Sequence, residues 1–180
     1  LQGLSVAQAV RAMAAALGSP FEVSGAAHDP ARLETYLRIE GFDASVSYRL
    51  TRLKALLAGQ GAEMTVLNDP SVVWAGIRDV APLVGQAGDL WRLSVQPSTA
   101  PGLLDLLPEG AQVLLDWGGG LIWVRITAGT DLRGLLGPIK GHATLMHSAS
   151  GLPIFHPQTP QVAALSAALR AKFDPREIFK

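Results

Sequence analysis

Two extended runs separated by three consecutive glycines constrain this chain most. Residues 112–117 and 121–126 are rich in Leu, Ile, Val and Trp, and Gly118, Gly119 and Gly120 lie between them. Glycine adopts the positive φ values that tight hairpin turns require, and most other residues do so only at a cost. The pattern therefore predicts a β-hairpin, and with it an antiparallel sheet at the centre of the fold.

The same three glycines also resemble a phosphate-binding loop. Such a loop continues into a Lys-Ser/Thr pair and a helix, whereas Gly120 is followed by Leu121 and Ile122 at the start of a strand. The sequence therefore favours the hairpin turn. Ser24 and Ser94 likewise lack the strand-to-helix elbow of a hydrolase nucleophile, which makes a serine hydrolase a poor interpretation.

Apolar periodicity predicts the other elements. Alternation with a period of two residues indicates strands, and a period of about 3.6 residues indicates amphipathic helices. Besides the hairpin, we expect strands at 21–27, 33–41, 62–67, 90–95 and 142–148. We expect helices at 5–17, 43–57, 70–82, 98–107, 132–136 and 160–172.

This order of elements predicts an α+β fold. Strands that follow one another come as hairpins, and each half of the chain holds a ββαβ or βαββ unit. We expect an antiparallel sheet of about seven strands from two ferredoxin-like halves, 1–85 and 86–180, with helices mainly on one face. Low charge and shared sheet edges favour a single unit over 1–180 rather than two domains.

Composition excludes several classes of function. The chain has no cysteine, which rules out disulfides, thiolate-held metal sites and a thiol nucleophile within it. Its 15 basic residues balance 15 acidic ones, so there is no general basic field for a nucleic acid. With 48% hydrophobic and only 17% charged residues, the chain is not intrinsically disordered, and its surface is poor in charge.

Neither a membrane span nor a leader peptide is visible. No run reaches the roughly 18 apolar residues that cross a bilayer, because Gln8 and Arg11 interrupt the alanine-rich start. The first residue is Leu1 rather than Met, and no basic segment precedes an apolar one. We therefore expect a piece of a longer chain.

Histidines do not indicate a metal site. His142 and His147 are five residues apart on a predicted strand, so their side chains point to opposite faces. The other two, His28 and His156, lie far away in sequence. We predict no metal; a site completed by a carboxylate from elsewhere in the fold is the weaker alternative.

Polar residues line one side of the predicted strands. Arg38, Arg92 and His142 alternate with large apolar neighbours, as do Glu40, Ser94, Asp116 and Arg125. A planar guanidinium binds a carboxylate through two hydrogen bonds, which points to an anion or substrate site on an open sheet face. Cross-strand salt bridges on that face are the alternative that we favour.

Six short segments, in order, resemble a known family. They are similar to the C-terminal half of the FAD-binding subunits of glycolate oxidase, which are vanillyl-alcohol-oxidase-like flavoproteins. The resemblance covers nearly the whole chain. It rests on Ser24-Gly25-Ala26-Ala27-His28, Arg38-Ile39-Glu40-Gly41-Phe42 with Ser45-Val46, Trp91-Arg92-Leu93-Ser94, Asp116-Trp117-Gly118-Gly119-Gly120-Leu121-Ile122-Trp123, Gly141-His142-Ala143-Thr144-Leu145 and Phe173-Asp174-Pro175.

The resemblance implies an oxidoreductase cap domain. In that family an N-terminal domain holds most of the FAD, and the cap closes over the flavin and shapes the site for glycolate or a similar 2-hydroxy acid. It implies that Arg38 and Arg92 bind the substrate carboxylate and that His142 is a polar group near the flavin edge. The N-terminal FAD domain and the other glycolate oxidase subunits would be partners, in the cytoplasm or at the inner membrane through those subunits.

Departures from the family pattern limit what is carried over. The terminal motif from Phe173 to Phe179 ends at Lys180, before the residues that approach the flavin in the family, and Lys140 and His147 replace a Gly and an Arg. We therefore expect the isolated chain to bind no FAD and to be inactive. A non-catalytic structural or subunit-interaction module is the alternative function. A cap separated from its partner domain should expose an apolar patch on the sheet face or along its rim, or cover that patch in a dimer.

Overall fold

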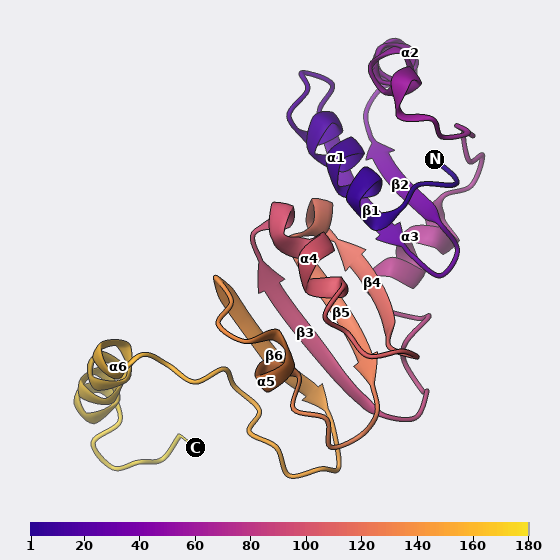
Figure 1. The fold of residues 1–180 in the computed structure, drawn as a ribbon. Coiled ribbons are helices and arrows are strands. Elements are labelled where there is room, and N and C mark those ends of the chain that lie inside the picture. The colour runs from indigo at the N-terminus through magenta and orange to yellow at the C-terminus, as the bar shows by residue number, and fades with distance from the viewer. Residues whose placement is uncertain (180) are drawn as a thin grey trace.

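The computed structural model describes residues 1–179, and its centre is one antiparallel sheet of six strands (Figure 1). The fold is α+β, as predicted. The strand order is β2-β1-β4-β5-β3-β6. The strands are β1 (Val23–Asp29), β2 (Glu34–Ile39), β3 (Asp89–Val95), β4 (Gln112–Asp116), β5 (Leu121–Ile126) and β6 (Gly141–His147).

Six α-helices accompany the sheet in the described residues. They are α1 (Val6–Leu17), α2 (Asp43–Leu57), α3 (Ser71–Arg78), α4 (Ala100–Leu104), α5 (Leu132–Leu136) and α6 (Pro160–Phe173). The first is fixed by a capping box, in which the side chains of Ser5 and Gln8 each bind the other's backbone N–H. No helix in the described residues has both the length and the apolar character needed to cross a bilayer.

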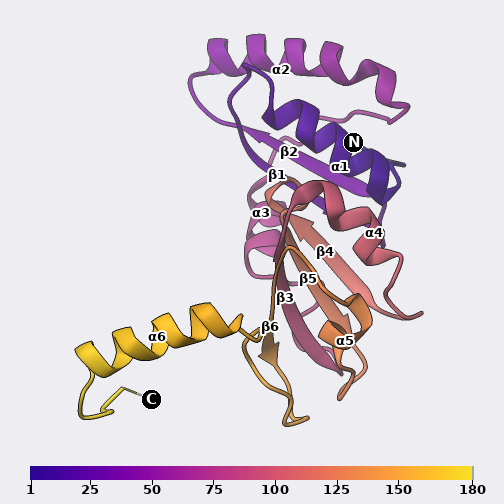
Figure 2. The same cartoon turned by 60° about the vertical axis from the view of Figure 1, so that its left-hand side comes forward.

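The main core lies on one face of the sheet, beneath α1, α4 and α5 (Figure 2). Trp91, Leu93 and Ile122 are almost fully buried there. Helix α1 adds Val10 and Met13 to the same cluster, so residues from both predicted halves share one core. Burial of this apolar surface is the main force that holds the first helix to the sheet.

The expected seventh strand at 62–67 is absent. Within residues 1–179 this segment makes one isolated bridge, between Gln2 and Glu63, and Gln2 also bridges Glu34 of β2. Gly3, with φ of 88°, then turns the chain away into α1. Residues 64–67 therefore have no strand beside them with which to pair.

The prediction of two ferredoxin-like halves is not confirmed. The first 85 residues supply only β1 and β2, whereas the remainder runs β3-α4-β4-β5-α5-β6. The two parts meet where β1 pairs with β4, through His28 and Leu115. One continuous sheet results, built unequally from the two parts.

Helix α6 stands away from the rest of the fold (Figures 1 and 2). None of its residues is buried. Apolar side chains at Val162, Leu165, Leu169 and Phe173 are all at least 49% exposed, and Phe155 and Phe179 beside the helix are 75% and 76% exposed. The expected bare apolar surface is thus present, but it lies on this projecting arm rather than on the sheet.

Candidate functional site

The predicted polar face exists, opposite the main core. Leu37, Leu93 and Ala143 pack in or against the main core, so alternation places their neighbours on the other face. Arg38, Arg92 and His142 therefore share that face, as predicted.

Part of this face is covered. After α3 the chain folds back so that Val80 and Leu83 pack on Leu90 and Leu114 in a small second cluster. Beside them Arg125 is buried, and its guanidinium donates hydrogen bonds to the carbonyl oxygens of Leu83 and Gly88. The accessible polar strip lies toward the β3–β6 side, around Arg92.

Arg38 is already engaged. Its Nε lies 3.2 Å from Glu40 Oε2 and 3.2 Å from Ser24 Oγ. The guanidinium carbon also stands 4.9 Å from the centre of the Trp74 ring of α3. This pairing fits the salt-bridge alternative considered from the sequence.

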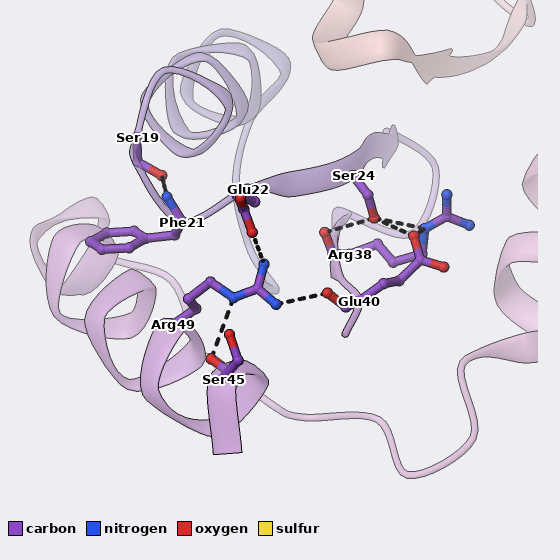
Figure 3. A network of polar contacts seen from close by, with 8 residues as sticks. All are labelled: Ser19, Phe21, Glu22, Ser24, Arg38, Glu40, Ser45 and Arg49. Carbon is purple, nitrogen blue, oxygen red and sulfur yellow. Dashed lines mark hydrogen bonds and ion pairs between the residues drawn. The ribbon is translucent and has the colours of Figure 1, made fainter. Parts of the chain in front are cut away.

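A second arginine network beside it anchors α2 (Figure 3). Arg49 is buried, and its guanidinium binds the carboxylate of Glu22 at 2.9 Å and the carbonyl oxygens of Glu40 and Ser45. The network joins α2 to the start of β1 and the end of β2. Each of the three guanidinium nitrogens donates to one of these structural contacts, so Arg49 serves the fold.

Arg92 differs from both. Its side chain is half-buried on β3, and among residues 1–179 it makes no hydrogen bond or ion pair with another side chain or with the backbone. Its guanidinium carbon lies 5.4 Å from the centre of the Trp117 ring, a cation–π contact. A half-desolvated guanidinium with unused donors is suited to binding a small anion.

The two arginines do not meet. β2 and β3 are four strand positions apart in the sheet order, or roughly 19 Å at the usual strand spacing. The expectation that Arg38 and Arg92 reach one small anion was therefore wrong. The alternation rule gave the correct face but carries no information on which strands are neighbours.

His142 lies next to Arg92. In the β3–β6 ladder Arg92 is opposite Thr144, and Ser94 is opposite His142. Arg92 and His142 are thus diagonal neighbours on one face, a relation with a typical Cα separation of about 7–8 Å. His142 is exposed at an edge strand, so both side chains are open to a ligand from the solvent side.

An acidic group stands between the arginines. Asp116 ends β4, and burial raises the pKa of its carboxyl, partly offset by the backbone N–H of Trp117, which donates to Oδ1 at 2.7 Å, and by the charge of Arg38. Asp116 pairs with Leu121, which in turn pairs with Ser94, so the carboxylate is two strands from Arg92. It does not neutralise that guanidinium by direct contact.

The glycine turn is not a phosphate cradle. A Cβ on Gly118 would approach Leu17 to 2.6 Å, and a Cβ on Gly119 would approach Val10 to 3.2 Å, so α1 fills the space a phosphate would need. The turn instead places Trp117, with φ of 53° and 58% exposure, beside Arg92. Sequence reasoning missed Trp117, although an aromatic residue next to three glycines was a usable signal.

One comparison identifies a relative. The chain is 30% identical over 162 residues to glycolate oxidase subunit GlcE of Escherichia coli strain K12, a match that covers 89% of this chain and 41% of the relative. The resemblance predicted from the sequence is therefore confirmed, and the chain spans about two fifths of the length of the curated relative it matches. No family model matches the chain, and no solved structure matches it.

Proposed function

We propose that this chain is the cap of an FAD-dependent 2-hydroxy-acid oxidoreductase subunit, with Arg92 as the group that binds the substrate carboxylate. The observation that carries the proposal is the unpaired guanidinium of Arg92, half-buried beside an exposed Trp117 on the accessible face. Similarity to a glycolate oxidase subunit supplies the chemical class. The chain would form the C-terminal part of a longer subunit.

Each side chain has a defined task in this proposal. Arg92 presents planar N–H donors that bind a carboxylate through two parallel hydrogen bonds, which fixes the orientation of the acid. Trp117 holds the guanidinium from one side and restricts its motion. His142 supplies a polar ring beside the bound acid, for the 2-hydroxyl or the flavin edge.

The flavin belongs to the remainder of the subunit. When bound it supplies the hydride acceptor for oxidation of the alcohol carbon. The glycine turn of this chain is filled by α1 and offers no phosphate cradle, which fits a cap that covers a cofactor held by an N-terminal FAD domain. Arg38, held by Glu40, Ser24 and Trp74, serves the fold in this scheme.

Helix α6 provides the docking surface in the same scheme. Its apolar side chains have no partner among the described residues, and exposed apolar surface of this kind marks sites of protein contact. The N-terminal FAD domain and the other subunits of a glycolate oxidase complex are the proposed partners. The similarity to a protein named as an oxidase subunit supports them.

The test compares Arg92→Lys with Arg38→Lys in the full-length protein with its partner subunits. We expect Arg92→Lys to raise the KM for glycolate by about tenfold or more, because Lys cannot reproduce the paired contact. Flavin absorption should be retained. Arg38→Lys is the matched control and should change KM less than twofold.

A contrary result has a defined meaning. Unchanged turnover by Arg92→Lys together with a large fall in Tm would assign Arg92 to structure. A full-length protein without a visible flavin band would reject the oxidoreductase cap itself. The chain would then be the structural or subunit-interaction module that the bare apolar face of α6 also supports.

A further inference from the structure

A groove of about 250 Å³ runs along the outer edge of β2. Residues 35–39 of β2 line one wall, and the segment 64–67 lines the other. Leu50 and Leu53 of α2 form part of an apolar floor. Leu1 closes one end.

Beyond Thr35, outward backbone groups of β2 face this groove without partners among residues 1–179. The N–H and C=O of Thr35 both point outward, because Thr35 exchanges two hydrogen bonds of 2.8 Å with Leu1. Alternation gives Leu37 and Ile39 the same outward direction. β1 is the only strand beside β2 in the described residues, so the outward groups of Leu37 lack a strand partner.

The groove is one strand wide. At its closed end Gln2 bridges Glu34 of β2 on one side and Glu63 on the other. The gap therefore spans two strand spacings, or roughly 9.6 Å. The segment 64–67, expected to be a strand, borders this gap. Among residues 1–179 the gap contains no strand with which this segment could pair.

The start of the chain already follows the path that a strand in the groove, between β2 and residues 64–67, would take. Leu1 N donates to Thr35 O as an amide would in an antiparallel ladder. Burial lowers the pKa of the Leu1 ammonium, so a charge at this point is desolvated, and an uncharged amide would not have that cost.

We propose that this groove seats the extended segment that joins Leu1 in the longer polypeptide, which enters as a strand antiparallel to β2. The inference rests on the proposed function, in which this chain is part of a larger subunit. The relative is more than twice as long as this chain, which leaves ample polypeptide to supply the strand. With this segment in the groove, residues 64–67 gain a neighbour with which to pair. The strand expected at 62–67 can then form.

The register follows from Leu1. Since Gln2 is opposite Glu34, the residue directly before Leu1 faces Tyr36, and the second residue before it faces Leu37. Directly opposed residues share a face. The second and fourth preceding residues thus point toward α2 and should be apolar, and the first and third lie on the Arg38 face.

A disulfide tests this register in the full-length protein. Tyr36→Cys is combined with Cys at the residue directly before Leu1, a non-hydrogen-bonded pair with Cα atoms about 4.5 Å apart, within disulfide range. The matched control moves that Cys to the second preceding residue, which points to the other face. This chain contributes no cysteine of its own.

We expect mass spectrometry to find the disulfide in the first pair and not in the control. No disulfide in either, or equal yields in both, would overturn the proposal. Hydrogen exchange gives a second measurement without substitutions: the Leu37 amide should exchange at least tenfold more slowly in the full-length protein than in residues 1–180. The Tyr36 amide, paired with β1, is the internal control.

Equal exchange of Leu37 in both proteins would also overturn the proposal. If slow exchange of the Leu37 amide depends on the concentration of the 180-residue chain, a second copy of the chain occupies the groove, and the proposal is overturned. Flavin absorbance and glycolate oxidation, recorded on the same samples, report on the proposed function independently. A protein that forms the disulfide but binds no flavin would support the proposed strand and contradict the proposed oxidoreductase function.

Discussion

The two edges of the sheet are treated in opposite ways. At β6 the outward backbone groups are satisfied from nearby in sequence: Leu145 N donates to Ile154 O at 2.9 Å, and Ala143 N donates to His156 Nδ1 at 3.3 Å. At β2 only the beginning of the edge is covered, by Leu1, and the rest opens onto the groove. Unpaired edges attract foreign strands, so native sheets cover them.

Arg133 explains how the β6 edge is closed. Its guanidinium donates to the carbonyl oxygens of Ala143, Pro153 and Ile154 and lies 4.7 Å from the centre of the Trp91 ring. One side chain thus fastens the segment after β6 to the strand. A local return of the chain can therefore close a sheet edge when a cation holds it, whereas the β2 edge has no such return among residues 1–179.

The largest effect is expected from removing that clamp. Arg133→Met leaves three carbonyl oxygens without a charged donor and removes the contact with Trp91, which should lower the free energy of unfolding by about 2–3 kcal/mol. Urea denaturation of the 180-residue chain measures it. Arg170→Met in the exposed helix α6 is the control, with an expected change below about 0.5 kcal/mol.

A change of similar size in both variants would mean that β6 is closed without Arg133. The backbone hydrogen bond from Leu145 N–H to the carbonyl oxygen of Ile154 would then be what closes the β6 edge. In hydrogen exchange, the Leu145 amide should lose protection in Arg133→Met and keep it in Arg170→Met.

A smaller effect is expected at the wall of the groove. Val66 is 47% exposed, so Val66→Asp should change the unfolding free energy of the isolated chain by less than about 0.5 kcal/mol. In the full-length protein the same change should cost about 1 kcal/mol, because Asp is disfavoured inside a sheet. Val72→Asp, exposed on α3, is the control and should behave alike in both proteins. If Val66→Asp lowers the free energy of unfolding equally in the isolated chain and in the full-length protein, no strand covers the β2 edge in the whole subunit.

The smallest effect concerns acid sensitivity on the β2 side. Burial lowers the pKa of His28, whose Nδ1 lies 3.0 Å from Thr35 Oγ1 and whose Nε2 has no partner in the part of the chain that the structure describes. Below about pH 6.5 the unfolded chain takes up a proton that folded His28 resists. The unfolded state then binds more protons, so the free energy of unfolding falls as the pH falls.

Urea denaturation at pH 7.5 and 5.5 checks this expectation. The wild-type chain should lose more stability between these values than His28→Asn, in which the titrating ring is absent. If both lose the same amount, His28 takes its proton in the folded state, and the β2 side has no special weakness in acid.

Local patterns predicted the elements well because each depends on nearby residues. The hairpin followed from the glycines after Trp117, and α1 followed from an apolar stripe with Ser5 at its start. The strand at 62–67 failed because a strand also needs a neighbour, which no local pattern supplies. The two ferredoxin-like halves are not confirmed for the same reason, since the pairing of β1 with β4 joins distant parts of the chain.

The candidate site shows the same division. Alternation placed Arg38, Arg92 and His142 on one face, which needs only the parity of each strand. Strand order then decided that Arg92 and His142 are neighbours and that Arg38 lies across the sheet. The partner of Arg92, Trp117, depends on the left-handed backbone of the turn, which the sequence pattern did not reveal.

The pairing of β1 with β4 also has a consequence for synthesis on the ribosome. The chain emerges from its N-terminal end, so α1, β1 and β2 leave the exit tunnel well before β4, the strand that completes their sheet. During that interval the inner edge of β1 is unpaired and the apolar stripe of α1 lacks most of its core. Such exposed edges are prone to wrong pairing, so the early part of this chain is where we expect a chaperone to be needed.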